Sequence, residues 1–160
     1  MAGNPGKDAA RRGPVRLWRS TRPVDHPLTR LNLDLGPDAV AGINTTVAIS
    51  PDGRRIVFPV RGTDGKQLLA TRLLDQAVPT LLAGTDNGSD VFFSPDSQWI
   101  GFFAAGLLKK ISVQGGAPVT LSPGTFSPRG ASWGDGDRIV ATLNNLVPLS
   151  LMPAAGGKAQ

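Results

Sequence analysis

A short turn motif recurs along this chain at intervals of about 40 residues. Ser50-Pro51-Asp52-Gly53 is followed 44 positions later by Ser94-Pro95-Asp96-Ser97, and 39 positions after that by Trp133-Gly134-Asp135-Gly136. Each copy precedes an apolar run, a corner that contains Gly or Asn, and a second apolar run. A repeat of this length indicates stacked supersecondary units, each of which buries its apolar face against its neighbours. The sequence therefore predicts an array of similar units.

Composition favours strands over helices. All 12 acidic residues are Asp, and the 20 Gly and 14 Pro residues make up about a fifth of the chain. Asp competes for local backbone hydrogen bonds and favours turns, whereas Glu, which is absent, is a good helix former. No window of helical length escapes Gly and Pro while keeping a period of 3.6 residues. We therefore expect an all-β fold.

The turn motif predicts how one unit folds. Pro at the second position of a type I turn sets φ near about −65°, Ser at the first position bonds the backbone beyond it, and Gly suits the fourth. In the first unit the flanking strands are expected at residues 46–50, 55–61, 67–73 and 78–82. In the second unit they are expected at 91–94, 99–104, 107–113 and 117–121. Four short antiparallel strands in about 40 residues are the size of one β-propeller blade.

Two sets of residues are predicted to have structural roles. The first set builds the turns: Ser50, Pro51, Asp52, Gly53, Ser94, Pro95, Asp96, Asp135 and Gly136. The second set is aromatic and is expected in the core between blades: Phe58, Phe92, Phe93, Trp99, Phe102, Phe103 and Trp133. Apolar runs with little alternation, as around these residues, are typical of strands covered on both faces.

Two positions depart from the turn motif. Ser97 stands where the first turn has Gly53, and we expect Ser97 to disfavour a left-handed backbone there. Trp133-Gly134 stands where the other turns have Ser-Pro, which leaves the type of the third turn open.

Positive charge is concentrated at the N-terminal end. Residues 1–30 contain seven basic groups and two Asp, which account for the net charge of +5, and the other 130 residues contain ten groups of each sign. Nucleic-acid-binding proteins place basic residues on the folded surface that reads the ligand, so no nucleic-acid partner is expected. We interpret residues 1–27 as a basic, irregular arm or linker, with contact to an anionic membrane as an alternative.

Motifs that could carry chemistry are incomplete. Gly130-Ala131-Ser132-Trp133-Gly134 matches the G-x-S-x-G nucleophile elbow, but that motif requires a following helix and a later His, whereas the only histidine is His26. Residues 86–90 and 135–137 resemble parts of a calcium loop but lack its spacing and its terminal Glu. A single imidazole lacks partner ligands for a metal, and cysteine is absent. The sequence predicts no catalytic residue, no metal site and no cofactor.

The residues that follow the turns carry a family resemblance. Residues 49–58 and 93–103 resemble the TolB-type, WD-repeat-like bacterial propeller blade. Residues 101–118 are similar to blades found C-terminal to the kinase domain of large bacterial serine/threonine protein kinases, and residues 31–37 resemble the strand that opens that propeller. The resemblance covers about residues 28–160. The Gly-rich loop, H-R-D and D-F-G motifs of a kinase domain are absent from the chain.

This resemblance implies a function and a location. It implies a non-catalytic module that binds a protein, peptide or small ligand on loops at one end of the ring, as the sensor or interaction part of a kinase-type protein. It also suggests a periplasmic or extracytoplasmic location. Two alternatives stay open: a substrate-gating propeller of a prolyl-oligopeptidase-type hydrolase, and a periplasmic TolB-like scaffold.

The repeats predict an incomplete ring. Blades are expected at about 43–85, 86–126 and 127–160, whereas a propeller has four to eight. We therefore expect a partial propeller at 28–160 that is a fragment of a longer parent chain, whose remaining blades are its partners. Residues 28–35 are a candidate ring-closing strand. An isolated piece is expected to be marginally stable or to self-associate through an open blade edge.

Overall fold

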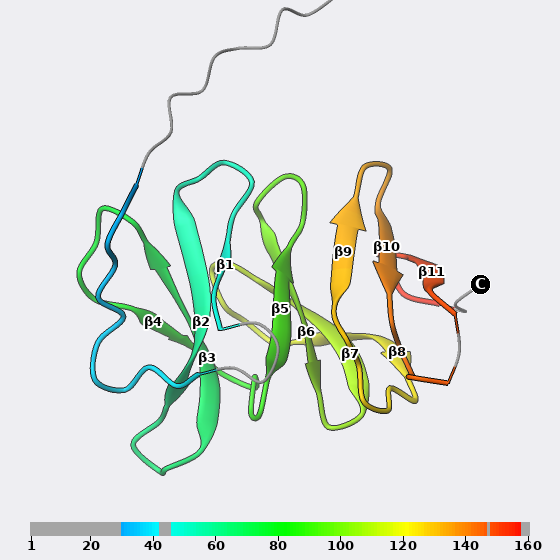
Figure 1. Cartoon of the computed structure of the whole chain (residues 1–160), viewed down its shortest axis with the longest axis horizontal. Coiled ribbons are helices and arrows are strands. Elements are labelled where there is room, and N and C mark those ends of the chain that lie inside the picture. Colours follow the sequence, from blue (N-terminus) through cyan, green and yellow to red (C-terminus); the bar gives the residue numbers. More distant parts are fainter. Residues whose placement is uncertain (1–29, 42–45, 147, 158–160) are drawn as a thin grey trace, which may run out of the picture. The chain divides into compact units, whose positions relative to one another are not determined.

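The described residues form an all-β structure. The computed structural model describes residues 30–41, 46–146 and 148–157, and the chain divides into two compact units, Met1–Leu33 and Asp34–Gln160. The unit Asp34–Gln160 contains three antiparallel sheets, which Figure 1 shows coloured in sequence order. Among the described residues there is no helix, and so none long and apolar enough to cross a membrane. The predicted fold class is confirmed for this part of the chain, whereas the arm at 1–27 and His26 lie outside it.

Each sheet is an up-and-down meander. The first sheet contains β1 (Ala48–Ile49), β2 (Arg55–Arg61), β3 (Gln67–Leu73) and β4 (Thr80–Leu82). The second contains β5 (Ser89–Phe93), β6 (Trp99–Ala104), β7 (Leu107–Ser112) and β8 (Val119–Pro123). The third contains β9 (Ala131–Gly134), β10 (Arg138–Ala141) and β11 (Ser150–Pro153). The strands β2, β3 and β6 coincide with the ranges expected from the turn motif, β7 ends one residue earlier than expected, and the edge strands differ by at most two residues at either end.

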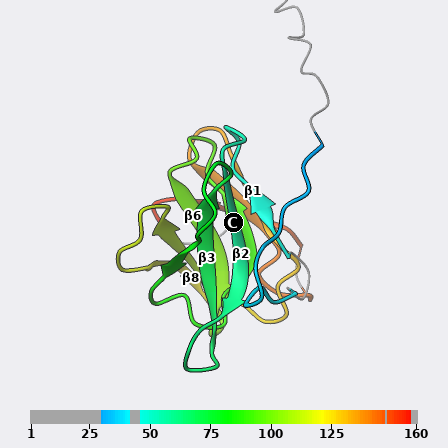
Figure 2. The same cartoon turned by 90° about the vertical axis from the view of Figure 1, so that its left-hand side faces the viewer.

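Two apolar clusters join the sheets. Val57 and Leu69 of the first sheet pack with Phe93, Ile100 and Phe102 of the second. A further cluster joins the second sheet to the third: Phe92, Phe103, Leu108, Leu121, Trp133, Ile139, Ala141, Leu143, Met152 and Ala154, with Trp99 and Ala131 partly buried against it. Figure 2, seen from the side of the first sheet, shows β2 and β3 in front of the second sheet. Since both faces of the second sheet are covered, its central strand β6 is apolar on both faces.

Phe58 was expected in the core between blades but does not lie between two of the described sheets. It is buried with Ile56 and Val60 on the face of the first sheet that is turned away from the second, and Leu35 and Ala39 pack against it. Side chains alternate along a strand, so Val57 and Phe58 must face opposite ways. Phe58 is therefore a core residue, but its neighbours come from residues 34–41, which we name the lead segment, rather than from a second blade.

Ser97 corrects the expectation about the second turn. Its φ is 61°, close to the φ of 70° at Gly53 in the first turn, so Ser97 does adopt the left-handed backbone. For a residue with a Cβ this conformation costs about 1–2 kcal/mol. Two hydrogen bonds offset that cost, because Ser97 N donates to Ser94 O at 2.9 Å and Ser97 Oγ accepts from Asp52 N at 3.2 Å.

The third turn is one residue shorter than the others. Trp133 pairs with Ile139 as Phe93 pairs with Ile100, so Trp133 is the structural equivalent of Phe93 rather than of Ser94. The sequence alignment of Trp133-Gly134 with Ser-Pro was wrong by this one residue. The consequence is that Trp133 is a strand residue that points into the core between the second and third sheets.

The candidate ring-closing strand is not paired in this structure. Residues 30–35 belong to no strand, and residues 28 and 29 lie outside the described part of the chain. Ala39 forms an isolated antiparallel bridge with Val60, so the lead segment runs along β2. A strand is defined by its neighbour, so the ring-closing role of 28–35 stays a prediction.

Candidate functional site

A cleft of about 690 Å³ lies between the second and third sheets, at the end where β5 turns into β6 and β9 turns into β10. Figure 1 shows both of these turns, and the turn from β1 to β2, at the same end of the sheets. The cleft is lined by Ser94, Pro95, Asp96, Trp99, Lys110, Trp133, Gly134, Asp135, Gly136, Asp137, Arg138, Leu151, Met152, Pro153, Ala154 and Ala155. A volume of this size is typical of small-molecule sites in proteins.

The second turn presents a fixed carboxylate to the cleft. Ser94 Oγ donates to Asp96 Oδ1 at 2.5 Å and accepts from Trp99 N at 2.9 Å. The Ser94 hydroxyl, followed by the Gln98 backbone N–H, lowers the pKa of Asp96 below its ordinary value because both donate to the ionised form. Asp96 is therefore a carboxylate at neutral pH, and its orientation is set by the turn.

The first turn repeats this arrangement outside the cleft. Ser50 Oγ donates to Asp52 Oδ1 at 2.5 Å, and Arg54 N donates to the same oxygen at 3.1 Å. These two contacts, the hydroxyl first, lower the pKa of Asp52 below its ordinary value. The Asp carboxylates of both Ser-Pro-Asp motifs thus accept hydrogen bonds within their own turns and stabilise them.

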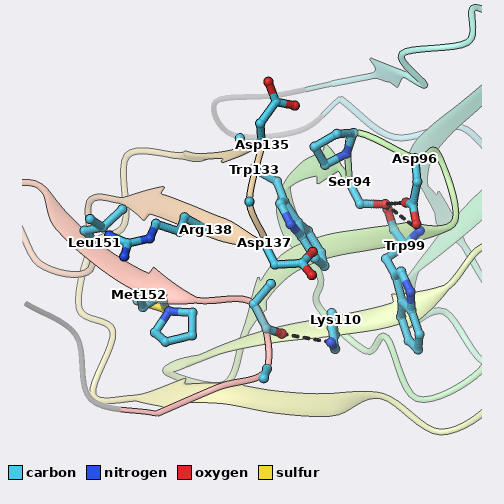
Figure 3. A pocket seen from close by; sticks show the side chains of 16 residues that line it. Ser94, Asp96, Trp99, Lys110, Trp133, Asp135, Asp137, Arg138, Leu151 and Met152 are labelled. Atoms are coloured by element: carbon cyan, nitrogen blue, oxygen red, sulfur yellow. Dashed lines mark hydrogen bonds between the residues drawn. The ribbon is translucent and has the colours of Figure 1, made fainter.

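Lys110 supplies a cation to the wall of the cleft. It lies on β7, and its Nζ donates to Ala154 O at 2.8 Å. The same Nζ lies 4.7 Å from the ring centroid of Trp99 and 5.7 Å from that of Trp133. An ammonium over an indole face is attracted by the ring quadrupole. Lys110 is therefore held in place from three directions, as Figure 3 shows.

Trp133 forms the buried wall of the cleft. The residue is 8% exposed, and its ring packs edge-on against Phe92, with ring centroids 6.5 Å apart. Its indole Nε1 is buried and has no hydrogen-bond acceptor among the described residues. Buried Trp N–H groups are usually paired, so this donor is an unsatisfied feature of the cleft wall.

The third turn carries the exposed rim. Asp135, Asp137 and Arg138 are all exposed there, and Asp137 adopts a φ of 54°. Ala154 N donates to Asp137 O at 2.8 Å, which ties this turn to the chain beyond β11. Because Lys110 bonds the carbonyl of that same Ala154, the third turn and the second sheet are connected through one residue.

Five of the nine predicted turn residues line this cleft: Ser94, Pro95, Asp96, Asp135 and Gly136. Ser50, Pro51, Asp52 and Gly53 lie in the first turn instead. Of the predicted aromatic set, Trp99 and Trp133 line the cleft, and the others are core residues.

Sequence analysis missed Lys110, Asp137 and Arg138. Lys109 and Lys110 are adjacent on one strand, so their side chains must point to opposite faces, and one of them must face the third sheet. That alternation was the signal that could have identified Lys110.

The two incomplete chemical motifs lie apart from this arrangement. Ser132 of the G-x-S-x-G match lies within β9, paired with Val140, instead of on a strand-to-helix turn. In residues 86–90, Asn87 and Asp90 adopt positive φ, at 53° and 49°. No cluster of three or more His, Cys, Asp or Glu side chains suited to a metal occurs within the described ranges.

The three sheets and their stacking define the described part of Asp34–Gln160 as consecutive blades of a β-propeller. No protein-family model and no curated protein sequence matches the chain. Among solved structures, a protein provisionally assigned as TolB from Agrobacterium tumefaciens is 20% identical, with a TM-score of 0.58 over 70% of this chain and 46% of that chain. The β-propeller domain of Cps50 (Swd1) from Myceliophteria thermophila is 16% identical, with a TM-score of 0.51 over 77% of this chain and 38% of that one.

These similarities confirm the predicted propeller fold. The matched part of this chain spans less than half the length of either structure, which agrees with a partial propeller. At such identities the similarity establishes the fold alone, because one fold supports many functions.

Proposed function

We propose that this chain is a non-catalytic binding module whose ligand site is the cleft between the second and third blades. One observation carries the proposal: charged and aromatic side chains converge on an open cleft in an otherwise apolar interface between blades. Sites for small ligands combine apolar walls with a few oriented polar groups. Here Trp99 supplies part of an apolar wall, and Lys110 supplies an oriented polar group.

At the corresponding position between the first and second blades, the side chains contact one another directly. Thr71, the equivalent of Lys110, is buried and contacts Arg55, the equivalent of Trp99, at 3.3 Å. Asp52 N reaches Ser97 Oγ of the next turn directly. Gly136, which follows Asp135 as Ser97 follows Asp96, has no hydroxyl with which to make the same link. The absence of that hydroxyl gives a physical reason for the opening.

Binding to this cleft can be measured with the protein's own tryptophans. Two of the three, Trp99 and Trp133, line the cleft. We expect that titration of the full 160-residue chain with amino acids, short peptides, sugars and nucleotides finds at least one ligand that changes the fluorescence saturably. We also expect Trp99→Ala to weaken that ligand at least tenfold. Lys66→Ala, on the exposed turn between β2 and β3, is the matched control. Saturable binding that is insensitive to Trp99, or no binding of any class, would contradict the proposal.

We further propose that the module is the sensor or interaction part of a larger serine/threonine kinase-type protein. This proposal rests on the resemblance of residues 101–118 to blades that follow such kinase domains. The flanking coding sequence tests it: a kinase domain and a membrane span upstream would support it. A downstream α/β-hydrolase with Ser, Asp and His in that order would favour a substrate-gating propeller instead.

A further inference from the structure

Opposite charges lie at different depths in the cleft. Asp96, Asp135 and Asp137 are exposed on the two turns, whereas Lys110 is half-buried below them. The ion pair found among the described residues is Lys66 with Asp64, at 3.6 Å and outside the cleft, so no carboxylate of these residues lies within 4.0 Å of Lys110 Nζ. The rim of the cleft therefore carries three carboxylates and the Arg138 guanidinium above a cationic wall, and Figure 3 shows Asp137 between Asp135 and Lys110.

The Lys110 ammonium has N–H groups available to a ligand. A Lys ammonium carries three N–H donors and no acceptor. Among the described residues Ala154 O takes one of them, and the faces of Trp99 and Trp133 keep the ammonium in place. A group with acceptor oxygens can therefore bind Lys110 without displacing it.

Trp133 supplies a second and independent reason for an acceptor at this depth. Trp133 is 8% exposed as a residue, it lines the cleft, and its Nε1 is buried without an acceptor within the described residues. An unsatisfied buried donor costs about 1–3 kcal/mol. Lys110 Nζ lies 5.7 Å from the centroid of this ring, so a carboxylate bound beside Lys110 would offer Nε1 an acceptor if the indole turned toward it.

The carboxylates at the rim favour a positively charged group on the ligand. Asp135 and Asp137 lie two residues apart on one turn, and ionised carboxylates only accept hydrogen bonds. A ligand that carried a carboxylate alone would meet repulsion as it passed these residues. A ligand with an ammonium at its other end would instead be attracted at both depths.

We propose that the cleft binds a zwitterionic ligand, a free amino acid or short peptide, whose carboxylate meets Lys110 and Trp133 and whose ammonium meets Asp135 and Asp137. This inference rests on the proposed binding function and names its ligand class. A cleft of about 690 Å³ has room for a di- or tripeptide. The carboxylates at the rim and the Lys110 ammonium below them also fix the orientation of the bound ligand in the cleft.

The test compares tripeptides that differ only at their ends. The full chain is titrated with Ala-Ala-Ala carrying free termini, with its N-acetyl form and with its C-terminal amide, and binding is followed by tryptophan fluorescence and calorimetry. We expect the free tripeptide to bind and each blocked form to bind at least tenfold more weakly, because each loses a charge-assisted hydrogen bond.

Variants assign each end of the ligand to its residues. Lys110→Met is expected to weaken the free tripeptide at least tenfold and to abolish discrimination against the amide. Lys109→Met is the matched control, because Lys109 pairs with Phe102 on the opposite face of β7. The double variant Asp135→Asn, Asp137→Asn is expected to abolish discrimination against the N-acetyl form. Thermal melting of each variant verifies that it remains folded.

The outcomes separate this inference from the binding function. Equal binding of free and blocked tripeptides, or equal effects of Lys109→Met and Lys110→Met, would overturn the zwitterion proposal. If the tripeptides fail to bind while another ligand binds in a manner that depends on Trp99, the zwitterion proposal is wrong and the cleft remains a binding site. If nothing binds, both proposals are wrong.

Discussion

One cross-strand position shows how single residues adapt the blades to their neighbours. Ala48 pairs with Val57 in the first blade and Ser132 with Val140 in the third, a small residue opposite Val in each case. In the second blade the sizes are reversed, because Phe92 pairs with Gly101. A Cβ on Gly101 would lie 2.2 Å from Phe92 Cζ, so the ring occupies the space that Val fills in the other blades.

We predict that Gly101→Val is destabilising and that Phe92→Ala partly rescues it. Overpacking a core typically costs about 1–3 kcal/mol of unfolding free energy, and adding Val here meets a ring with little room to move. Removal of the ring recreates the Ala–Val pair of the first blade. Urea unfolding of the single and double variants should give a coupling energy of about 0.5–3 kcal/mol. Strictly additive effects would show that the two residues do not share this space.

At the scale of elements, the lead segment is bound to the first blade by a small set of hydrogen bonds. Arg72 on β3 donates Nη1 to Asp34 O at 2.9 Å and to Ala77 O at 3.3 Å. Val40 N donates to Pro59 O at 2.9 Å, and Arg61 N donates to Asp38 O at 2.8 Å. The buried Arg72 therefore connects the lead segment to the turn between β3 and β4 while Leu35 and Ala39 cover the apolar face.

We predict that Arg72→Met loosens the lead segment and leaves the rest of the sheet intact. Hydrogen bonds from charged groups contribute about 1.5–3 kcal/mol, so amide exchange at Val40 and Arg61 should accelerate about tenfold or more. The amide of Leu69, which donates to Thr85 Oγ1 at 2.9 Å, should remain protected. Arg55→Met is the control, since Arg55 contacts Thr71 instead of the lead segment. Unchanged exchange at Val40 and Arg61 would refute the anchoring role of Arg72.

At the scale of the whole second unit, the third blade exposes a face that the other blades bury. Val57 and Leu69 face the second blade and are 0% exposed. The equivalent Val140 is 39% exposed, and Leu149, which takes the position of Leu69 when the register of β10 and β11 is extended, is 69% exposed. The third sheet also has three strands, so the outer edge of β11 is unpaired within the described residues. Open edges and apolar faces favour association.

We predict that the 160-residue chain self-associates through this face. Light scattering at increasing protein concentration should show association, and Leu149→Lys should reduce it because a charge opposes burial. Val78→Lys is the matched control, since Val78 is 77% exposed on the first blade. A sharp monomeric melt that is independent of concentration would contradict this prediction.

The sequence predicted the parts of the molecule that depend on neighbouring residues. The ranges of β2, β3 and β6 follow from Ser-Pro-Asp turns and apolar runs, because turn chemistry and strand length are local properties. Trp99 and Asp96 were predicted to be structural residues, whereas the contact of Trp99 with Lys110 was not predicted. Ser97 was misjudged because its cost is offset by Asp52, which is 45 residues away.

Only the tertiary structure decided which faces meet. A shift of one residue in a strand reverses the direction of every side chain, and the short third turn puts Trp133, predicted in the core, in register with Phe93 rather than with Ser94. Stacking of the blades then placed Lys110 between two indoles and put Phe58 under the lead segment. Local sequence thus determined that blades form, whereas the register of pairing and the packing of one sheet on another determined where a cleft remains between them.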